Sequence, residues 1–273
     1  MAERLLAANL SVIAYNRTQA KLQPLKNAGA AIAQSPVEVL QQADCVLLML
    51  TDATAIQTVL LSPEARPALA GRTIIQMGTI APSESCAIAA EVKAAGGDYL
   101  EAPVLGSIPE AQAGKLMVMV GGSPEQFQHW FSLLQQLGSK PQLIGEVGSA
   151  AALKLALNQL IGSLTTAFAL SLGFVLRQGV DVETFMGILR DSALYAPTFD
   201  KKLQRMVERN YANPNFPTKH LLKDMNLFLG EAQSAGLNVS SLEGVREILE
   251  IAQKLNLAEG DYSALFSAVN PQD

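Results

Sequence analysis

Asp44-Cys45-Val46-Leu47-Leu48-Met49-Leu50 is a nearly unbroken apolar run. A continuous run of this kind is typical of a parallel strand that is covered on both faces. Short β-rich runs alternate with helical runs up to about residue 146, and this alternation predicts a doubly wound α/β sheet. The other predicted strands are 10–15, 73–77, 99–104 and 116–120, and the predicted helices are 2–8, 18–28, 83–95 and 124–137.

The strand signals stop after residue 147, and the rest of the chain has the pattern of helices. The first of them, over 148–178, would be roughly 45 Å long, which is enough to run from one domain into the next. We therefore expect a sheet domain over 1–147, followed by an all-helical domain over 148–273. The further helices are predicted over 181–191, 197–209, 218–235, 240–256 and 261–268.

The composition narrows the class of protein. Hydrophobic residues make up 49% of the chain and charged residues 16%, so the chain has ample material for a core. A net charge of −5 and a pI near 5.2 argue against a nucleic-acid-binding protein. Two histidines, His129 and His220, are too few for a zinc site, and Cys45 and Cys86 are expected to be reduced core residues of a cytoplasmic protein.

One apolar stretch raises the question of a membrane span. Residues 153–176 contain Lys154, Asn158 and further polar residues, and Arg177 follows them. We therefore expect a long buried helix of a soluble protein and no membrane association.

The segment Gly148-Ser149-Ala150-Ala151-Ala152-Leu153-Lys154-Leu155-Ala156-Leu157-Asn158 places a lysine and a carboxamide on an otherwise apolar helix. Lys154 and Asn158 are four residues apart, so their side chains share a helix face. Burying an ammonium group is costly unless a partner or a reaction uses it, and burial moves its pKa toward the range where it can donate a proton. Lys154 is therefore a candidate general acid, and the alternative is a surface lysine at the start of an exposed helix.

A doubly wound nucleotide-binding sheet of the Rossmann type normally opens with a strand and a glycine-rich turn. This chain contains no G-x-G-x-x-G motif and starts in what resembles the first helix of such a fold, so we expect its first strand and glycine loop to be missing. The alternative is that no dinucleotide binds. The cofactor signal that follows is intact, because Asn16-Arg17-Thr18 comes directly after the strand that ends at Tyr15.

The chemistry of Asn16, Arg17 and Thr18 favours one cofactor. A carboxylate after this strand would bond the ribose hydroxyls of NAD, whereas a guanidinium with two neutral polar groups suits the 2′-phosphate of NADP. NAD remains possible. A structural interpretation is that Thr18 caps the helix after it, and both interpretations can hold together.

Five segments together resemble the β-hydroxyacid dehydrogenase family, which includes 3-hydroxyisobutyrate dehydrogenases and glyoxylate/succinic semialdehyde reductases. The resemblance covers nearly the whole chain and is closer to the glyoxylate/succinic semialdehyde branch. The segments are Asn16-Arg17-Thr18, Met77-Gly78-Thr79-Ile80-Ala81-Pro82, Glu101-Ala102-Pro103-Val104-Leu105-Gly106-Ser107, Gly148 to Asn158, and Phe216-Pro217-Thr218-Lys219-His220-Leu221-Leu222-Lys223-Asp224-Met225.

The resemblance implies that Lys154 is the catalytic lysine, which stabilises the alkoxide formed by hydride transfer and then supplies a proton. Asn158 would bind the substrate or orient Lys154. Gly106 and Ser107 would offer backbone N–H groups and a hydroxyl to a substrate carboxylate. The family usually has serine where this chain has Leu105, so one hydroxyl near that carboxylate is absent.

The resemblance also assigns cofactor contacts. Thr79 would touch the nicotinamide end of the dinucleotide, and Lys223 of the helical domain would close over the cofactor. Asp224 is as well explained by pairing with a basic neighbour as by a function, His220 is expected to be structural, and Trp130 is expected to pack on the helix that starts at Pro124.

These observations predict an NADP-dependent oxidoreductase that interconverts a small aldehyde acid and its hydroxy acid. The predicted partners are a small carboxylate-bearing substrate and a second copy of the chain, because the apolar helical half has surface to bury against itself. Two alternatives stay open. One is an NAD-dependent dehydrogenase of the 3-hydroxyisobutyrate type, and the other is a non-catalytic assembly protein that has lost cofactor binding.

Overall fold

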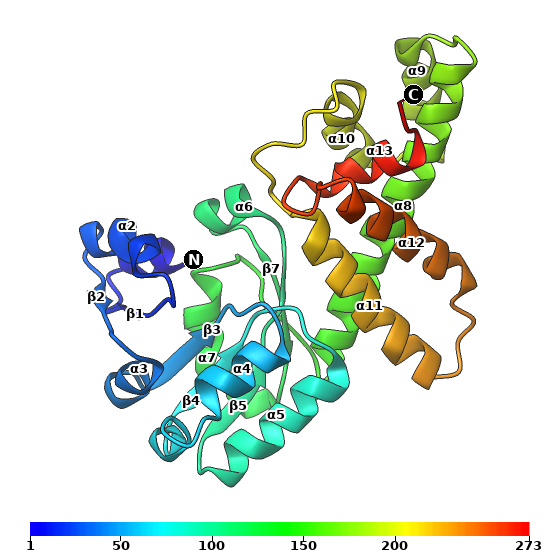
Figure 1. Ribbon diagram of the computed structural model, residues 1–273. Coiled ribbons are helices and arrows are strands. Elements are labelled where there is room, and N and C mark those ends of the chain that lie inside the picture. The colour runs from blue at the N-terminus through cyan, green and yellow to red at the C-terminus, as the bar shows by residue number, and fades with distance from the viewer. Residues whose placement is uncertain (273) are drawn as a thin grey trace. The chain divides into compact units, whose positions relative to one another are not determined.

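The computed structural model describes residues 1–272, and the chain divides into two compact units (Figure 1). The first unit is Met1–Lys154, and the second begins at Leu155. One long helix, α8 (Ser149–Arg177), starts in the first unit and continues into the second. Each unit is described by itself.

The first unit contains a six-stranded mixed sheet and a separate two-stranded pair. The six strands run in the order β3-β4-β5-β7-β6, with β8 paired to the other side of β7. Strands β3, β4 and β5 are parallel to one another, and β7 is antiparallel to β5 and β6. The strands are β3 (Cys45–Leu48), β4 (Thr73–Gln76), β5 (Asp98–Glu101), β6 (Val104–Leu105), β7 (Met117–Gly121), β8 (Gln142–Gly145), and the parallel pair β1 (Ile13–Ala14) and β2 (Ala31–Ile32).

Apolar side chains cover both faces of this sheet. Ile74 belongs to a buried cluster with residues of α3, α4 and α5, whereas its neighbour Ile75 belongs to a second cluster with residues of α1 and α7. Successive residues of a strand point to opposite faces, so the continuous apolar strands follow from burial on both sides. The prediction of a doubly wound sheet is confirmed.

The helices of the first unit begin where the sequence offers capping chemistry. Helix α7 starts at Pro124, and Ser123 and Gln126 form a reciprocal capping box around its first turn. The helices are α1 (Ala2–Ala7), α2 (Gln23–Asn27), α3 (Pro36–Gln42), α4 (Ala53–Leu60), α5 (Pro82–Ala94), α6 (Ile108–Ala113) and α7 (Pro124–Gln135), with the 3₁₀ turns η1 (Gln19–Leu22) and η2 (Arg66–Leu69).

The second unit is helical throughout its described residues, as predicted. Its core gathers Phe168 and Leu172 of α8 with residues from α11, α12 and the C-terminal turns. Phe168 stacks on Phe199 with ring centroids 4.6 Å apart. The helices after α8 are α9 (Val182–Arg190), α10 (Pro197–Val207), α11 (Thr218–Ser234), α12 (Ser240–Lys254) and α13 (Leu265–Val269), preceded by the 3₁₀ turn η3 (Tyr262–Ala264).

Several predicted elements differ from those observed. The strand expected over 10–15 keeps only β1, and the helix expected over 18–28 divides into η1 and α2. The strand expected over 99–104 breaks after Glu101 and resumes as β6, because Pro103 has no backbone N–H for pairing. Short elements that carry little periodicity were missed in the sequence, namely α3, α4, α6, β2, β8 and η2.

Two expectations about burial need correction. Cys86 is exposed and is not a core residue, although its thiol donates a hydrogen bond to the Val147 carbonyl. Cys45 is half-buried, and burial raises the pKa of its thiol to about 12. Helix α8 is only partly buried, because it exposes Leu160, Leu164 and Phe174. Among the described residues, α8 alone is long and apolar enough to cross a membrane. A single helix of this kind is weak evidence for a membrane span.

Candidate functional site

The predicted ribose-binding residues lie together in the turn after β1. Asn16, Arg17 and Thr18 are all exposed. Asn16 Oδ1 accepts the Thr18 backbone N–H at 2.8 Å, which fixes an Asx turn. Thr18 stands at the N-cap position of η1, but its side chain makes no capping hydrogen bond. The three residues thus present a guanidinium with neutral polar groups and no carboxylate, and such groups can hydrogen-bond a phosphate.

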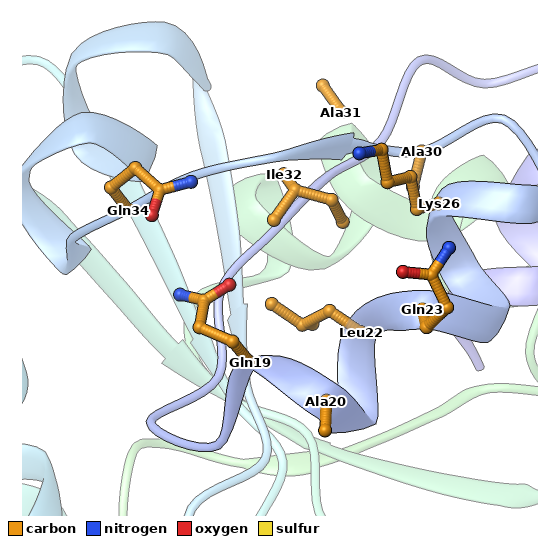
Figure 2. A pocket seen from close by; sticks show the side chains of 9 residues that line it. All are labelled: Gln19, Ala20, Leu22, Gln23, Lys26, Ala30, Ala31, Ile32 and Gln34. Carbon is orange, nitrogen blue, oxygen red and sulfur yellow. The ribbon is translucent and has the colours of Figure 1, made fainter.

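A shallow pocket of about 530 Å³ follows this turn in the chain (Figure 2). Leu22 and Ile32 form its apolar walls, and glutamine amides stand around them. Lys26 is its only titratable lining residue, so the pocket holds no acid–base pair and none of the predicted site residues. Its lining residues are Gln19, Ala20, Leu22, Gln23, Lys26, Ala30, Ala31, Ile32 and Gln34.

The loop that carries Thr79 is shaped by the last residue of β4. The buried Gln76 side chain accepts the Gly78 N–H at 2.6 Å and donates to the Gly78 carbonyl at 2.9 Å. Gly78 itself packs so closely that a Cβ there would lie 2.5 Å from the Leu50 carbonyl oxygen. Thr79 is half-buried just beyond this loop, at the carboxyl edge of the parallel strands, where ligands bind in such sheets.

Gly106 and Ser107 join β6 to α6. Gly106 has φ +131°, and a Cβ there would lie 2.9 Å from Leu116, so glycine is required on both counts. The Ser107 N–H and hydroxyl both donate to Glu110 Oε2, at 2.8 and 2.6 Å. The two groups that we expected to receive a substrate carboxylate are therefore occupied by the chain's own carboxylate, a contact that the sequence analysis missed.

Lys154 and Asn158 are both buried on α8, with 8% and 2% of their surfaces exposed. Their spacing on a continuous helix puts them one turn apart on one face, as the sequence predicts. The alternative of a surface lysine is wrong. Asn158 Oδ1 is buried and, within residues 1–272, has no hydrogen-bond donor, which makes it a candidate acceptor for a ligand hydroxyl or ammonium.

Asp224 joins two polar side chains within the second unit. Its carboxylate is 2% exposed; Oδ2 accepts from Asn158 Nδ2 at 2.6 Å, and Oδ1 lies 2.8 Å from Lys223 Nζ. Asp224 therefore pairs with a basic neighbour and fixes the amide of Asn158. The nearby His220 is partly buried, and burial together with Lys219 and Lys223 lowers its pKa, so the imidazole is neutral at pH 7.

Glu101 makes buried contacts that sequence reasoning missed. It ends β5, directly beside Gln76 of β4 in the parallel register, and it accepts backbone N–H groups from the start of α8. The first turn of α8 is thereby bound to the carboxyl edge that also carries the Thr79 loop. Lys154 follows this first turn on the same helix, and its side chain is buried.

Two family models together match residues 1–269. The model of the NAD binding domain of 6-phosphogluconate dehydrogenase matches residues 1–147, and the model described as NAD-binding of NADP-dependent 3-hydroxyisobutyrate dehydrogenase matches residues 148–269. Two relatives come from Arabidopsis thaliana. The chloroplastic glyoxylate/succinic semialdehyde reductase 2 is 30% identical over 98% of this chain and 75% of its own length. Glyoxylate/succinic semialdehyde reductase 1 is 30% identical over 98% of this chain and 93% of its own length.

A solved structure agrees in fold. The 3-hydroxyisobutyrate dehydrogenase from Salmonella typhimurium superposes with a TM-score of 0.87 at 22% identity, over 97% of this chain and 94% of its own. This similarity supports the assignment of a sheet domain followed by a helical domain. Together with the family models and the two reductases, it shows that the chain is a member of the β-hydroxyacid dehydrogenase family of NAD(P)-dependent oxidoreductases.

Proposed function

We propose that the protein is an NADP-dependent oxidoreductase that interconverts a small aldehyde acid, of the glyoxylate or succinic semialdehyde type, and its hydroxy acid. The observation that carries the proposal is the burial of Lys154 one helical turn before Asn158, on a helix whose start is held at the carboxyl edge of the sheet. In this proposal residues 1–147 bind the cofactor, and residues 148–273 complete the active site.

The residues around β1 and β4 suit the dinucleotide. Arg17 would pair with the 2′-phosphate, with Asn16 and Thr18 beside it, while Thr79 would contact the nicotinamide end and Lys223 would contribute from α11. When bound, the reduced nicotinamide supplies a hydride to the carbonyl carbon of the substrate. The description of the model that matches residues 148–269 names an NADP-dependent enzyme, which supports this choice of cofactor.

Lys154 performs the proton chemistry. As the carbonyl carbon accepts the hydride, the carbonyl oxygen gains the electron pair of the broken π bond and becomes anionic. The Lys154 ammonium stabilises that charge and transfers a proton from Nζ to the oxygen, so the product is an alcohol and the lysine is left neutral. Asn158 Oδ1 is an acceptor that can orient the ammonium or the new hydroxyl.

The substrate carboxylate is assigned to the turn at Gly106 and Ser107. In the structure Glu110 holds both donors of Ser107, so the substrate carboxylate must displace Glu110 before it can bond them. Leu105 contributes no hydroxyl to this turn. We infer that carboxylate binding is coupled to a rearrangement at the start of α6.

The proposal predicts NADPH oxidation with glyoxylate or succinic semialdehyde and a preference for NADPH over NADH. Arg17→Asp is expected to raise the KM for NADPH about tenfold or more, because a charge-assisted bond to phosphate contributes about 1.5–3 kcal/mol. It is expected not to raise the KM for NADH, because a carboxylate there can bond the ribose hydroxyls. Initial rates with both cofactors measure this, and calorimetric titration with NADPH measures binding directly.

Arg66→Asp is the matched control, since Arg66 is an exposed arginine of the first unit that pairs with Glu91. Faster turnover with NAD and 3-hydroxyisobutyrate would favour the alternative dehydrogenase. A folded protein that gives no heat with either cofactor would support the non-catalytic alternative, and equal effects of Arg17→Asp on both cofactors would refute the assignment of Arg17.

The same proposal includes a homo-oligomer assembled through α8. Leu160, Leu164, Ala167, Ser171 and Phe174 are all exposed, and they alternate at spacings of four and three residues. This heptad spacing is that of a coiled-coil seam, and such a seam on one helix is complementary to the same seam on a second copy. The predicted occupant is therefore α8 of another chain.

Leu164→Glu is expected to convert the oligomer to a monomer, because it places a charge in the middle of the seam. Size-exclusion chromatography with light scattering measures the mass of wild type and variant. Ile188→Glu is the control, since Ile188 is an equally apolar exposed residue on α9. A wild-type protein that elutes as a monomer at all concentrations contradicts the proposal.

We also place the protein in the cytoplasm, since Cys45 and Cys86 form no disulfide among the described residues.

A further inference from the structure

Glu101 is a carboxylate that the proposed chemistry does not use, although only 1% of its surface is exposed. Its Oε1 accepts three backbone N–H groups, from Gly148 at 2.9 Å, Ala150 at 2.8 Å and Ala151 at 3.0 Å. A buried carboxylate is tolerated only when such bonds compensate its lost hydration. The three donors lie 47 to 50 residues away in sequence, at the start of α8.

These bonds complete the hydrogen bonding of the first turn of α8. The Ser149 N–H donates to the Glu146 carbonyl, and the Ala152 N–H donates to the Gly148 carbonyl. Glu101 receives the two N–H groups between them. A helix start leaves four N–H groups without intrahelical partners, so a single remote side chain supplies the acceptor that no local residue of α8 provides.

Two glycines beside Glu101 make room for its carboxylate and for the backbone that donates to it. Gly121 of β7 stands opposite Glu101 in the antiparallel register, and a Cβ at that position would overlap Glu101 Oε1. Gly148, which donates the first N–H, has φ +100°, a conformation that L side chains rarely adopt. Two glycines therefore leave room for the carboxylate and for the bend of the chain that meets it.

The other oxygen of Glu101 is held by a directed chain of hydroxyl groups. Ser85 Oγ donates its one proton to Glu101 Oε2 at 2.5 Å, so the bond of 2.9 Å between Ser85 and Tyr99 is donated by the tyrosine. Burial raises the pKa of Tyr99, which keeps its hydroxyl protonated. The other titratable group beside this cluster is the Cys86 thiol of α5, which donates to the Val147 carbonyl.

We propose that Glu101 is a positioning residue for Lys154: its carboxylate holds the first turn of α8 at the carboxyl edge of the sheet, and its negative charge favours the ammonium form one turn later. Lys154 follows Ala151 by three residues, or about 4.5 Å along the helix axis. The charge of Glu101 and the positive end of the helix dipole act on the ammonium with opposite signs. This inference rests on the proposed role of Lys154 as general acid.

Glu101→Gln keeps the shape and an acceptor oxygen but removes the charge. It is expected to lower kcat about tenfold with little change in the KM for the aldehyde acid. In the pH profile of kcat for reduction, the basic limb is the fall in kcat at high pH, and we expect the midpoint of that fall to move to a pH lower by about half a unit or more. The sign follows because losing a nearby negative charge lowers the pKa of Lys154, and the reductase needs the protonated amine. Glu101→Asp retains the charge on a shorter side chain, so it is expected to lower kcat without moving the limb.

Asp181→Asn is the matched control, because Asp181 is a carboxylate that caps the start of another helix, α9. It is expected to change neither kcat nor the limb. If Glu101→Gln and Glu101→Asp lower kcat equally and the basic limb of the pH profile stays in place, Glu101 is only a structural cap of α8 and the inference is overturned. If Glu101→Gln does not fold, a Glu101→Asp variant with wild-type kcat overturns it as well.

The charge coupling can also be measured without turnover. NMR titration of ¹³C-labelled lysine, with the resonance assigned by Lys154→Arg, reports the pKa of Lys154 in wild type and in Glu101→Gln. A lower pKa in the variant supports the coupling, and an equal pKa refutes it. If Lys154→Ala keeps its turnover, the proposed function fails on its own, whatever the titration shows, so the two failures are distinguishable.

Discussion

Lys154→Ala is expected to lower kcat for carbonyl reduction by about 10²-fold or more, with a much smaller change in the KM for NADPH. The expectation follows because the ammonium acts on the oxyanion that exists only as hydride arrives, and a positioned general acid contributes about 10²–10⁴-fold. Steady-state rates with glyoxylate and succinic semialdehyde measure the loss. Lys154 is 8% exposed on α8, so alanine also leaves space beside Asn158.

Two variants separate proton donation from charge alone. Lys154→Arg keeps a positive charge but is too weak an acid to give up its proton, so it is expected to recover only a small part of the lost rate. Lys140→Ala removes an exposed lysine from the same unit and is expected to have wild-type kinetics. Near-normal turnover in Lys154→Ala would show that another group supplies the proton, and the proposed chemistry would then be wrong.

Much of the fold follows from local pattern. The run at 44–50 predicts a strand buried on both faces, and the structure has β3 there with apolar residues packed on either side. The long helix predicted over 148–178 is observed as α8, within one residue at each end. Short strands such as β2 were not predictable, because two residues carry no periodicity and their pairing depends on a remote partner.

The site shows the same division between local and remote information. The spacing of Lys154 and Asn158 predicts a shared helix face, and burial of both residues agrees with it. The sequence does not show that Ser107 donates to Glu110, or that Asp224 joins Asn158 to Lys223 across 66 residues. Glu101 was overlooked for the same reason, because its role depends on backbone N–H groups that only tertiary folding brings to it.

The second large effect concerns stability. Lys202 of α10 and Asp261 form a buried ion pair in the second unit, with Lys202 Nζ 2.8 Å from both carboxylate oxygens. Asp261 Oδ1 also accepts the N–H and hydroxyl of Ser263, and the ammonium lies 4.1 Å from the ring centroid of Tyr262. Lys202→Ala is expected to cost about 3–5 kcal/mol, because it leaves a buried carboxylate without its cation. Against a total of about 5–15 kcal/mol, that loss threatens the folding of the unit.

Urea unfolding followed by circular dichroism measures this cost, with the transition of the helical unit analysed separately because two units need not unfold together. Lys219→Ala is the control, since Lys219 pairs with Glu259 at the surface and is expected to contribute only about 0–1 kcal/mol. A deficit below about 1 kcal/mol would show that the ammonium is not what stabilises the buried carboxylate.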